Sequence, residues 1–144
     1  MARTMFWQEK GYRADWNRDC KAGRYQGCPE LKKTMLLFDS IKHRCETKGI
    51  PFELTAGWIR ERLDKGVCEA TGLPFDFRRD PENRRVNPFS PSVDRIDQKG
   101  GYAPENCRVV VAMFNMARNE WKDDELYAVA KAFCTEYEKT RTLN

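Results

Sequence analysis

The sequence has few of the groups that build histidine-dependent or cysteine-rich metal sites. Its 144 residues contain one histidine, His43. Zinc sites with two or more histidine ligands are therefore excluded, and histidine-based catalysis has a single candidate. The six cysteines are irregularly spaced and form no Cys-x-x-Cys pair, so we do not expect structural zinc. Cys20 and Cys28 are the nearest pair. They are either free thiols or part of a metal-binding knuckle.

Long apolar runs are also missing. No stretch approaches the roughly 18 apolar residues that a membrane span requires, so we expect no membrane partner. The first residues, MARTMFWQEKGYRADW, carry charges too early and too often for a signal peptide. The scattered cysteines fit a reducing compartment. We therefore expect a cytoplasmic protein.

Charge is present in both signs, with a small basic excess. Lys and Arg number 26 and Asp and Glu 22, a formal net charge of +4; residues 1–50 carry a net charge of +5 and the rest of the chain −1. This balance fits an anionic partner such as nucleic acid, although the same charge also serves solubility. The length indicates one domain.

Apolar side chains at three- and four-residue steps predict helices. The first runs from Pro29 to a stop at Gly49, and the second from an N-cap at Thr55 to Gly66. A third is expected near residues 112–119. Asp123 is a suitable cap for a last helix.

Short extended segments lie between these helices. Residues 91–97 and 107–111 are predicted strands, and residues 67–77 read as a strand, a turn and a second extended piece. The predicted fold class is α+β in a single domain. It comprises a basic N-terminal arm and helix (1–49), a core (50–121) and a C-terminal helix (122–144) that packs on the core.

The informative segment is 91–121, PSVDRIDQKGGYAPENCRVVVAMFNMARNEW. It resembles the core of the HNH endonucleases, the ββα-metal or His-Me finger nucleases. The resemblance is carried by Asp94, the turn Gly101-Tyr102, Asn106 followed by Arg108-Val109-Val110, and Asn115. The upstream stretch GVCEATGLPF, residues 66–75, is similar to the element that precedes this core in many members. Together they cover about half of the chain.

The resemblance implies a ββα-metal core and a function. Asp94 and Asn115 correspond to the metal ligands of the family, and Asn106 to the asparagine that orders the loop and positions the general base. One carboxylate and one amide oxygen suit a single Mg²⁺ or Mn²⁺ ion. The implied reaction is hydrolysis of DNA phosphodiester bonds, by nicking or double-strand cleavage. Small proteins of this kind are often encoded by phages or bacteria.

The sequence departs from the family motif at Arg95, where the family places the histidine that activates water. An arginine stays protonated, so it is a poor base and a good phosphate clamp. Asp97 or His43 can be the alternative base, or the metal ion can activate water alone. A further alternative is a catalytically inactive or weakened HNH fold that binds DNA or protein.

Basic side chains surround the core in sequence, and we expect them to contact DNA phosphates. They are Arg78, Arg79, Arg84, Arg85, Lys99, Arg108 and Arg118. No recognition helix or zinc finger for reading bases is evident, so protein partners, oligomeric state and target sequence stay open.

Overall fold

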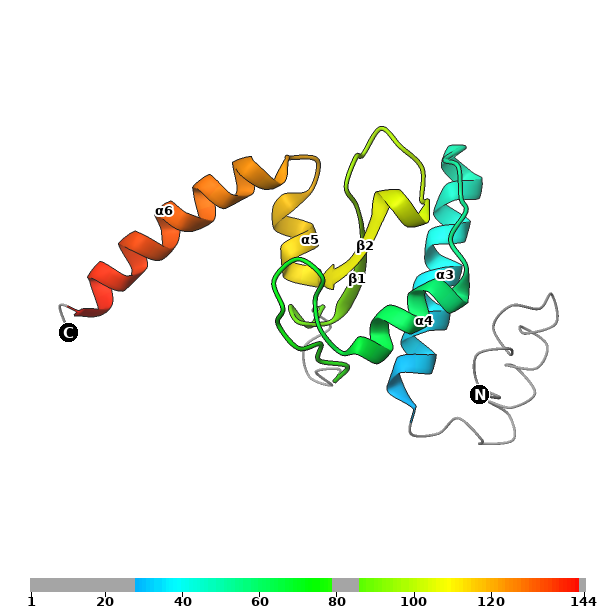
Figure 1. The fold of residues 1–144 in the computed structure, drawn as a ribbon, viewed down its shortest axis with the longest axis horizontal. Coiled ribbons are helices and arrows are strands. Elements are labelled where there is room, and N and C mark those ends of the chain that lie inside the picture. Colours follow the sequence, from blue (N-terminus) through cyan, green and yellow to red (C-terminus); the bar gives the residue numbers. More distant parts are fainter. Residues whose placement is uncertain (1–27, 79–85, 143–144) are drawn as a thin grey trace.

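The computed structural model describes residues 28–78 and 86–142. Helix α3 is followed by helix α4, strand β1, a short 3₁₀ helix η1, strand β2 and helices α5 and α6 (Figure 1). Their bounds are Pro29–Lys48 (α3), Ala56–Lys65 (α4), Pro91–Arg95 (β1), Pro104–Asn106 (η1), Cys107–Val111 (β2), Ala112–Arg118 (α5) and Asp123–Thr142 (α6). The fold is α+β, as predicted.

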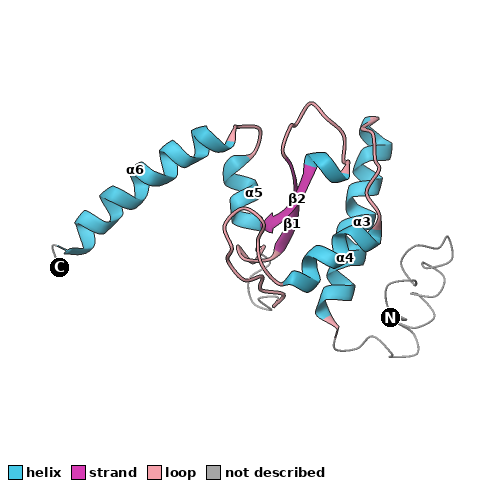
Figure 2. Cartoon of the chain, in the orientation of Figure 1, coloured by secondary structure: helices cyan, strands magenta, loops and turns pink. Residues whose placement is uncertain are grey.

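Strands β1 and β2 form a two-stranded antiparallel sheet (Figure 2). In its register Val93 lies opposite Val109, and Asp94 lies opposite Arg108. Side chains of directly opposed residues share a face, and successive residues alternate between faces. The two valines therefore face one side, and the aspartate–arginine pair faces the other.

The main core fills the space between the sheet and helices α3 and α4. Buried side chains from all three elements meet there, because the apolar stripe of each helix faces the sheet. The cluster comprises Ile41, Cys45, Leu54, Ile59, Leu63, Val93, Tyr102, Cys107 and Val109.

The predicted ends of α3 and α4 are confirmed. Gly49 and Gly66 follow α3 and α4 with φ values of 65° and 76°, in the left-handed region that favours glycine. At the start of α4, the Thr55 side chain accepts a hydrogen bond from the Trp58 backbone N–H at 3.1 Å. Local signals therefore set the limits of both helices.

Residues 67–77 keep the predicted turn between two extended pieces, with the Cys68 N–H donating to the Leu73 carbonyl at 2.8 Å, but they form no regular strand. The structure has only an isolated bridge between Val67 and Pro74 there. The segment instead attaches to β2: the Glu69 N–H donates to the Val109 carbonyl at 2.9 Å, and the Val109 N–H donates to Glu69 Oε2 at 2.6 Å. A side-chain carboxylate thus replaces part of a strand ladder.

Helix α6 also differs from the prediction. It was expected to pack on the core, yet none of its residues is buried, and it extends away from the rest of the described chain (Figure 1). The physical reason is that both faces of the sheet are already covered, one by α3 and α4 and the other by α5. None of the described helices combines the length and apolar character needed to cross a membrane.

Candidate active site

The candidate site is built around the Asp94 carboxylate, which lies near the end of β1. Its Oδ1 accepts a hydrogen bond from Arg118 Nη1 at 2.8 Å, and its Oδ2 accepts one from Arg108 Nε at 2.9 Å. The side chain is fully covered, with 0% of its surface exposed. Because an unpaired buried carboxylate is very unfavourable, these two guanidinium groups are what allow Asp94 to lie inside the protein.

A second carboxylate completes the arrangement from the first turn of α6. Asp123 accepts hydrogen bonds from both Nη atoms of Arg108, at 2.8 and 2.7 Å, and from Arg118 Nε at 2.8 Å. Two carboxylates and two guanidinium groups therefore balance in charge. We call these four residues the ion network.

The ion network shifts the pKa values of its accessible members. Hydrogen bonds, first from Arg108 and then from Arg118, lower the pKa of Asp123 to about 2. Hydrogen bonds to Asp123 and Asp94 raise the pKa of Arg108 further above its ordinary value. Both directions favour the charged forms that attract each other.

Arg118 also fastens α5 to the end of β1. Its Nη1 donates to the Arg95 carbonyl at 3.0 Å, and its Nη2 donates to the Ile96 carbonyl. Only 3% of its side chain is exposed. Its donors are thus used inside the protein.

Asn115, the second predicted metal ligand, lies on α5 beside β1. Its Nδ2 donates to Ser92 Oγ at 2.8 Å and to the carbonyl of Val93, next to Asp94, at 3.2 Å. No hydrogen bond to Asn115 Oδ1 is found from the described residues. The contact between β1 and α5 therefore holds Asn115 beside the strand that carries Asp94, with the amide nitrogen of Asn115 engaged.

Asn106 ties the loop between the strands together. Its Oδ1 accepts from the Asp97 N–H, and its Nδ2 donates to the carbonyls of Asp97 and Gly101, all at 2.9 Å. All three bonds are within the loop, so the amide of Asn106 orders the connection between β1 and η1.

Arg95 occupies the position where the family motif has histidine. Its Nη1 donates to the Gly100 carbonyl at 3.0 Å, and its Nη2 donates to Gln98 Oε1 at 2.9 Å. The guanidinium lies over the Tyr102 ring, 4.8 Å from its centroid, a cation–π distance. Arg95 is thus held against the turn.

The two alternative bases lie apart from this arrangement. Asp97 was expected two residues after Arg95 on the same strand face, which is wrong: β1 ends at Arg95, and Asp97 Oδ1 accepts the Lys99 N–H at 2.9 Å in the following turn. His43 is exposed on α3, whereas Ile41 and Cys45 of that helix are buried. A role for either residue as base stays a prediction.

The predicted DNA-binding residues fall into three groups. Arg78 is exposed and paired with Asp76 at 2.8 Å, and Lys99 is exposed in the turn after β1. Arg108 and Arg118 belong to the ion network. Arg79, Arg84 and Arg85 lie outside the described residues, as does Cys20 of the possible metal knuckle.

Asp123 is the site residue that sequence reasoning missed, because it was interpreted only as a helix cap. The signal available was its position five residues after Arg118, across a short turn. Over residues 28–78 and 86–142, no group of three or more His, Cys, Asp or Glu side chains could hold a metal ion. Among the cysteines, burial raises the pKa of Cys107 to about 12, so this thiol is unsuited to be a ligand or nucleophile.

Comparisons with known proteins support the nuclease architecture. The rare-cutting HNH restriction endonuclease PacI matches in structure with a TM-score of 0.50, over 74% of this chain and 80% of PacI, at 16% sequence identity. This likeness shows that the two chains share a fold. No family model matches the sequence.

One curated relative has a detectable sequence similarity. It is an uncharacterized 29.0 kDa protein of Enterobacteria phage T4, from the dda-modA intergenic region, 26% identical over 97 residues. The match covers 67% of this chain and 36% of the T4 protein. The HNH-fold chain described here therefore spans about a third of that relative.

Replacing Arg118 tests whether the ion network holds the fold together. Arg118→Leu leaves Asp94 buried with one guanidinium instead of two, and we expect it to cost about 3–5 kcal/mol of unfolding free energy. Arg78→Leu, a matched change on the surface, should stay within about 0.5 kcal/mol. Urea denaturation measures both, and equal midpoints would contradict a structural role for Arg118.

Acid titration tests the second carboxylate. Because the pKa of Asp123 is lowered from 3.8 to about 2, its contribution is fully present above pH 3.8 and disappears as the pH falls to about 2. Asp123 is half exposed, so we expect Asp123→Asn to cost no more than about 1 kcal/mol near neutral pH. The difference in unfolding free energy between the wild type and Asp123→Asn should therefore disappear as the pH is lowered.

Urea denaturation midpoints of the wild type and of Asp123→Asn, measured at several pH values, give this comparison. Asp124→Asn is the control, because it removes a carboxylate that lies outside the ion network. A difference that stays constant down to the lowest pH would show that Asp123 contributes nothing through its charge.

Proposed function

We propose that this protein is a metal-dependent endonuclease that hydrolyses DNA phosphodiester bonds. The observation that carries the proposal is that Asn115 on α5 donates to Ser92 and to the carbonyl of Val93, the two residues that precede Asp94 on β1. Asp94 and Asn115 are the two residues that the sequence resemblance aligns with the metal ligands. The similarity to a T4 protein is compatible with a phage origin and a cytoplasmic location.

The donor set of Asp94 and Asn115 fits Mg²⁺ or Mn²⁺. Each Asp94 oxygen accepts one hydrogen bond and keeps a lone pair, and the amide nitrogen of Asn115 is already used, so its oxygen is available. Two hard oxygen ligands suit ions that keep several waters. When bound, such an ion supplies charge stabilisation at the phosphodiester and the leaving oxygen.

The chain's own residues prepare this site. Arg108 and Arg118 fix the orientation of the Asp94 carboxylate, as outer partners of metal-ligating carboxylates commonly do. Since these two groups also cover the carboxylate completely, a cation at Asp94 replaces one of the two contacts. Arg108 is the more accessible of the pair, with 16% of its side chain exposed.

Arg95 has the chemistry of a phosphate-binding residue. Its guanidinium carries a permanent positive charge and is held over Tyr102 and against the Gly100 carbonyl. This fixed position suits contact with a phosphate oxygen on the DNA backbone. Proton abstraction is not a role that arginine can fill.

A second candidate function is DNA binding without cleavage. The observation that favours it is the complete coverage of Asp94 by two arginines, together with an arginine in place of the histidine. In that case the ion network serves stability alone.

Plasmid nicking in Mg²⁺ or Mn²⁺ tests the proposal. Asp94→Asn keeps the shape of the side chain, and Asn115→Ala removes the amide oxygen; we expect each to lower the nicking rate by about 100-fold or more, because several kcal/mol of charge stabilisation is lost. EDTA should abolish nicking. Asp124→Asn is the control carboxylate, and circular dichroism checks folding.

The two candidate functions give different outcomes in this assay. DNA binding with no nicking in either metal, by folded wild-type protein at high concentration, would reject the endonuclease and support the binding module.

Substitution of Arg95 tests the site where the motif departs from the family. Arg95→His supplies a base, and we expect a faster rate, up to the factor of about 10²–10⁴ that general-base catalysis contributes. Arg95→Gln, the control, should weaken DNA binding without changing the pH profile. The measurement is the single-turnover cleavage rate across pH, and an unchanged rate for Arg95→His would mean that this position does not face the attacking water.

A further inference from the structure

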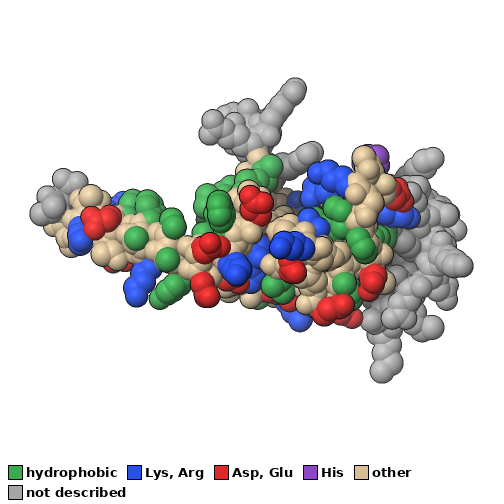
Figure 3. Space-filling view, turned by 90° about the horizontal axis from the view of Figure 1, so that it is seen from above, with side chains coloured by type: hydrophobic (Ala, Val, Ile, Leu, Met, Phe, Trp, Pro, Cys, Tyr) green, Lys and Arg blue, Asp and Glu red, His purple; other side chains and the backbone are tan. Residues whose placement is uncertain are grey.

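Helix α6 is the feature that the proposed function leaves unexplained. It is 20 residues long, about 30 Å at 1.5 Å per residue, and none of its residues is buried. Large apolar side chains are nevertheless present along it: Val129 is 69% exposed and Phe133 64%. Figure 3 shows hydrophobic side chains exposed along this projecting helix.

These side chains lie in one stripe. At about 100° of rotation per residue, Leu126, Val129, Ala130, Phe133 and Tyr137 fall on one face of α6. The Phe133 and Tyr137 rings stack with centroids 5.6 Å apart. Leu126 is half-buried where α6 leaves the body, so the stripe begins at the body and continues outwards. We call it the α6 stripe.

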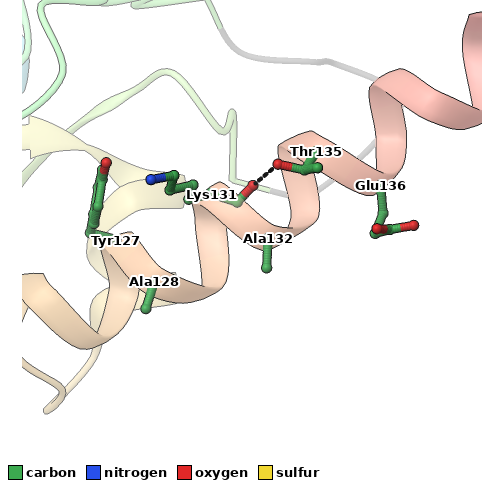
Figure 4. A pocket seen from close by; sticks show the side chains of 6 residues that line it. All are labelled: Tyr127, Ala128, Lys131, Ala132, Thr135 and Glu136. Atoms are coloured by element: carbon green, nitrogen blue, oxygen red, sulfur yellow. Dashed lines mark hydrogen bonds between the residues drawn. The ribbon is translucent and has the colours of Figure 1, made fainter.

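The opposite face of α6 is different in character. Figure 4 shows the side chains that line a pocket there: the small Ala128 and Ala132, the polar Lys131, Thr135 and Glu136, and Tyr127. Thr135 Oγ1 donates to the Lys131 carbonyl at 3.0 Å. This face suits solvent, so α6 is amphipathic and the stripe is the face that lacks cover from the described residues.

The charge of α6 argues against two classes of partner. The helix has five acidic and three basic side chains, a net charge of −2. A nucleic acid backbone is repelled by such a helix, and an anionic membrane surface prefers basic ones. The occupant is therefore a protein surface that matches an apolar stripe.

We propose that the α6 stripe binds the α6 stripe of a second copy of this chain, with the two helices antiparallel. A twofold axis between Lys131 and Ala132 places Phe133 opposite Ala130 of the second copy, a large side chain against a small one. The same axis places Leu126 opposite Tyr137. Each contact occurs twice, as an isologous interface requires.

Charges at the two ends of α6 favour the antiparallel orientation. The first turn carries Asp123, Asp124 and Glu125, and the last turn carries Lys139 and Arg141. In an antiparallel pair the acidic first turn of each α6 therefore lies near the basic last turn of the other. A parallel pair instead brings like ends together, and its helix dipoles repel.

The projection of α6 leaves most of its length open to a second helix (Figure 1). Because α6 extends away from the body (Figure 1), a second helix can lie along it, with its own body at the far end.

Molar mass in solution tests the proposal on the full chain. Light scattering after size exclusion, across a wide range of protein concentration, should give about twice 16.9 kDa. Phe133→Glu should raise the dissociation constant of the dimer at least about 30-fold. Thr135→Glu, on the opposite face of the same helix, should leave it within about twofold.

Both positions are exposed, so folding is not at risk. A wild-type monomer at all concentrations overturns the proposal, including the case where residues 1–27 of the same chain cover the stripe. Equal effects of Phe133→Glu and Thr135→Glu overturn the assignment of the stripe as the interface.

Disulfide formation tests the orientation. In a Cys134→Ser background, Leu126→Cys and Tyr137→Cys should each resist cross-linking alone and form an interchain disulfide when mixed, because only the antiparallel pair brings the two positions together. Cross-linking of each variant with itself would establish a parallel pair instead.

Discussion

The described structure depends on how the Asp94 carboxylate is accommodated. A buried carboxylate needs charge compensation and hydrogen bonds, and Asp94 receives both from Arg108 on β2 and Arg118 on α5. Asp123 at the start of α6 then binds the remaining donors of the same two arginines. One buried charge therefore fixes the relative positions of the sheet, the short helix behind it and the root of the long helix.

Much of the fold could be predicted from local sequence. Thr55, Gly49 and Gly66 cap helices through contacts with residues one turn away. The structure confirms the helix ends that they predict. The strands were also found, because their apolar residues form short runs between turn residues. The order of Asp94, Asn106 and Asn115 along the chain was enough to indicate the HNH fold.

The rest depended on contacts between residues far apart in sequence. Nothing near Asp94 indicates that Arg108 and Arg118 cover it completely, since the same sequence is compatible with an open carboxylate. Glu69 binds the backbone N–H of Val109 across 40 residues, a contact that the local sequence does not indicate. The last helix was expected to pack on the core because it is amphipathic. An apolar stripe, however, does not indicate which surface covers the helix.

Asp123 belongs to two parts of the molecule at once, since it is a residue of the ion network and the first residue of α6. A ligand at Asp94 that displaces Arg108 changes the contacts of Asp123, and a partner on α6 that moves Asp123 changes the contacts of Asp94. Such effects are reciprocal free energies, equal in size in both directions. A ligand at Asp94 and a partner on α6 would therefore be thermodynamically linked through a single carboxylate, without any change of fold.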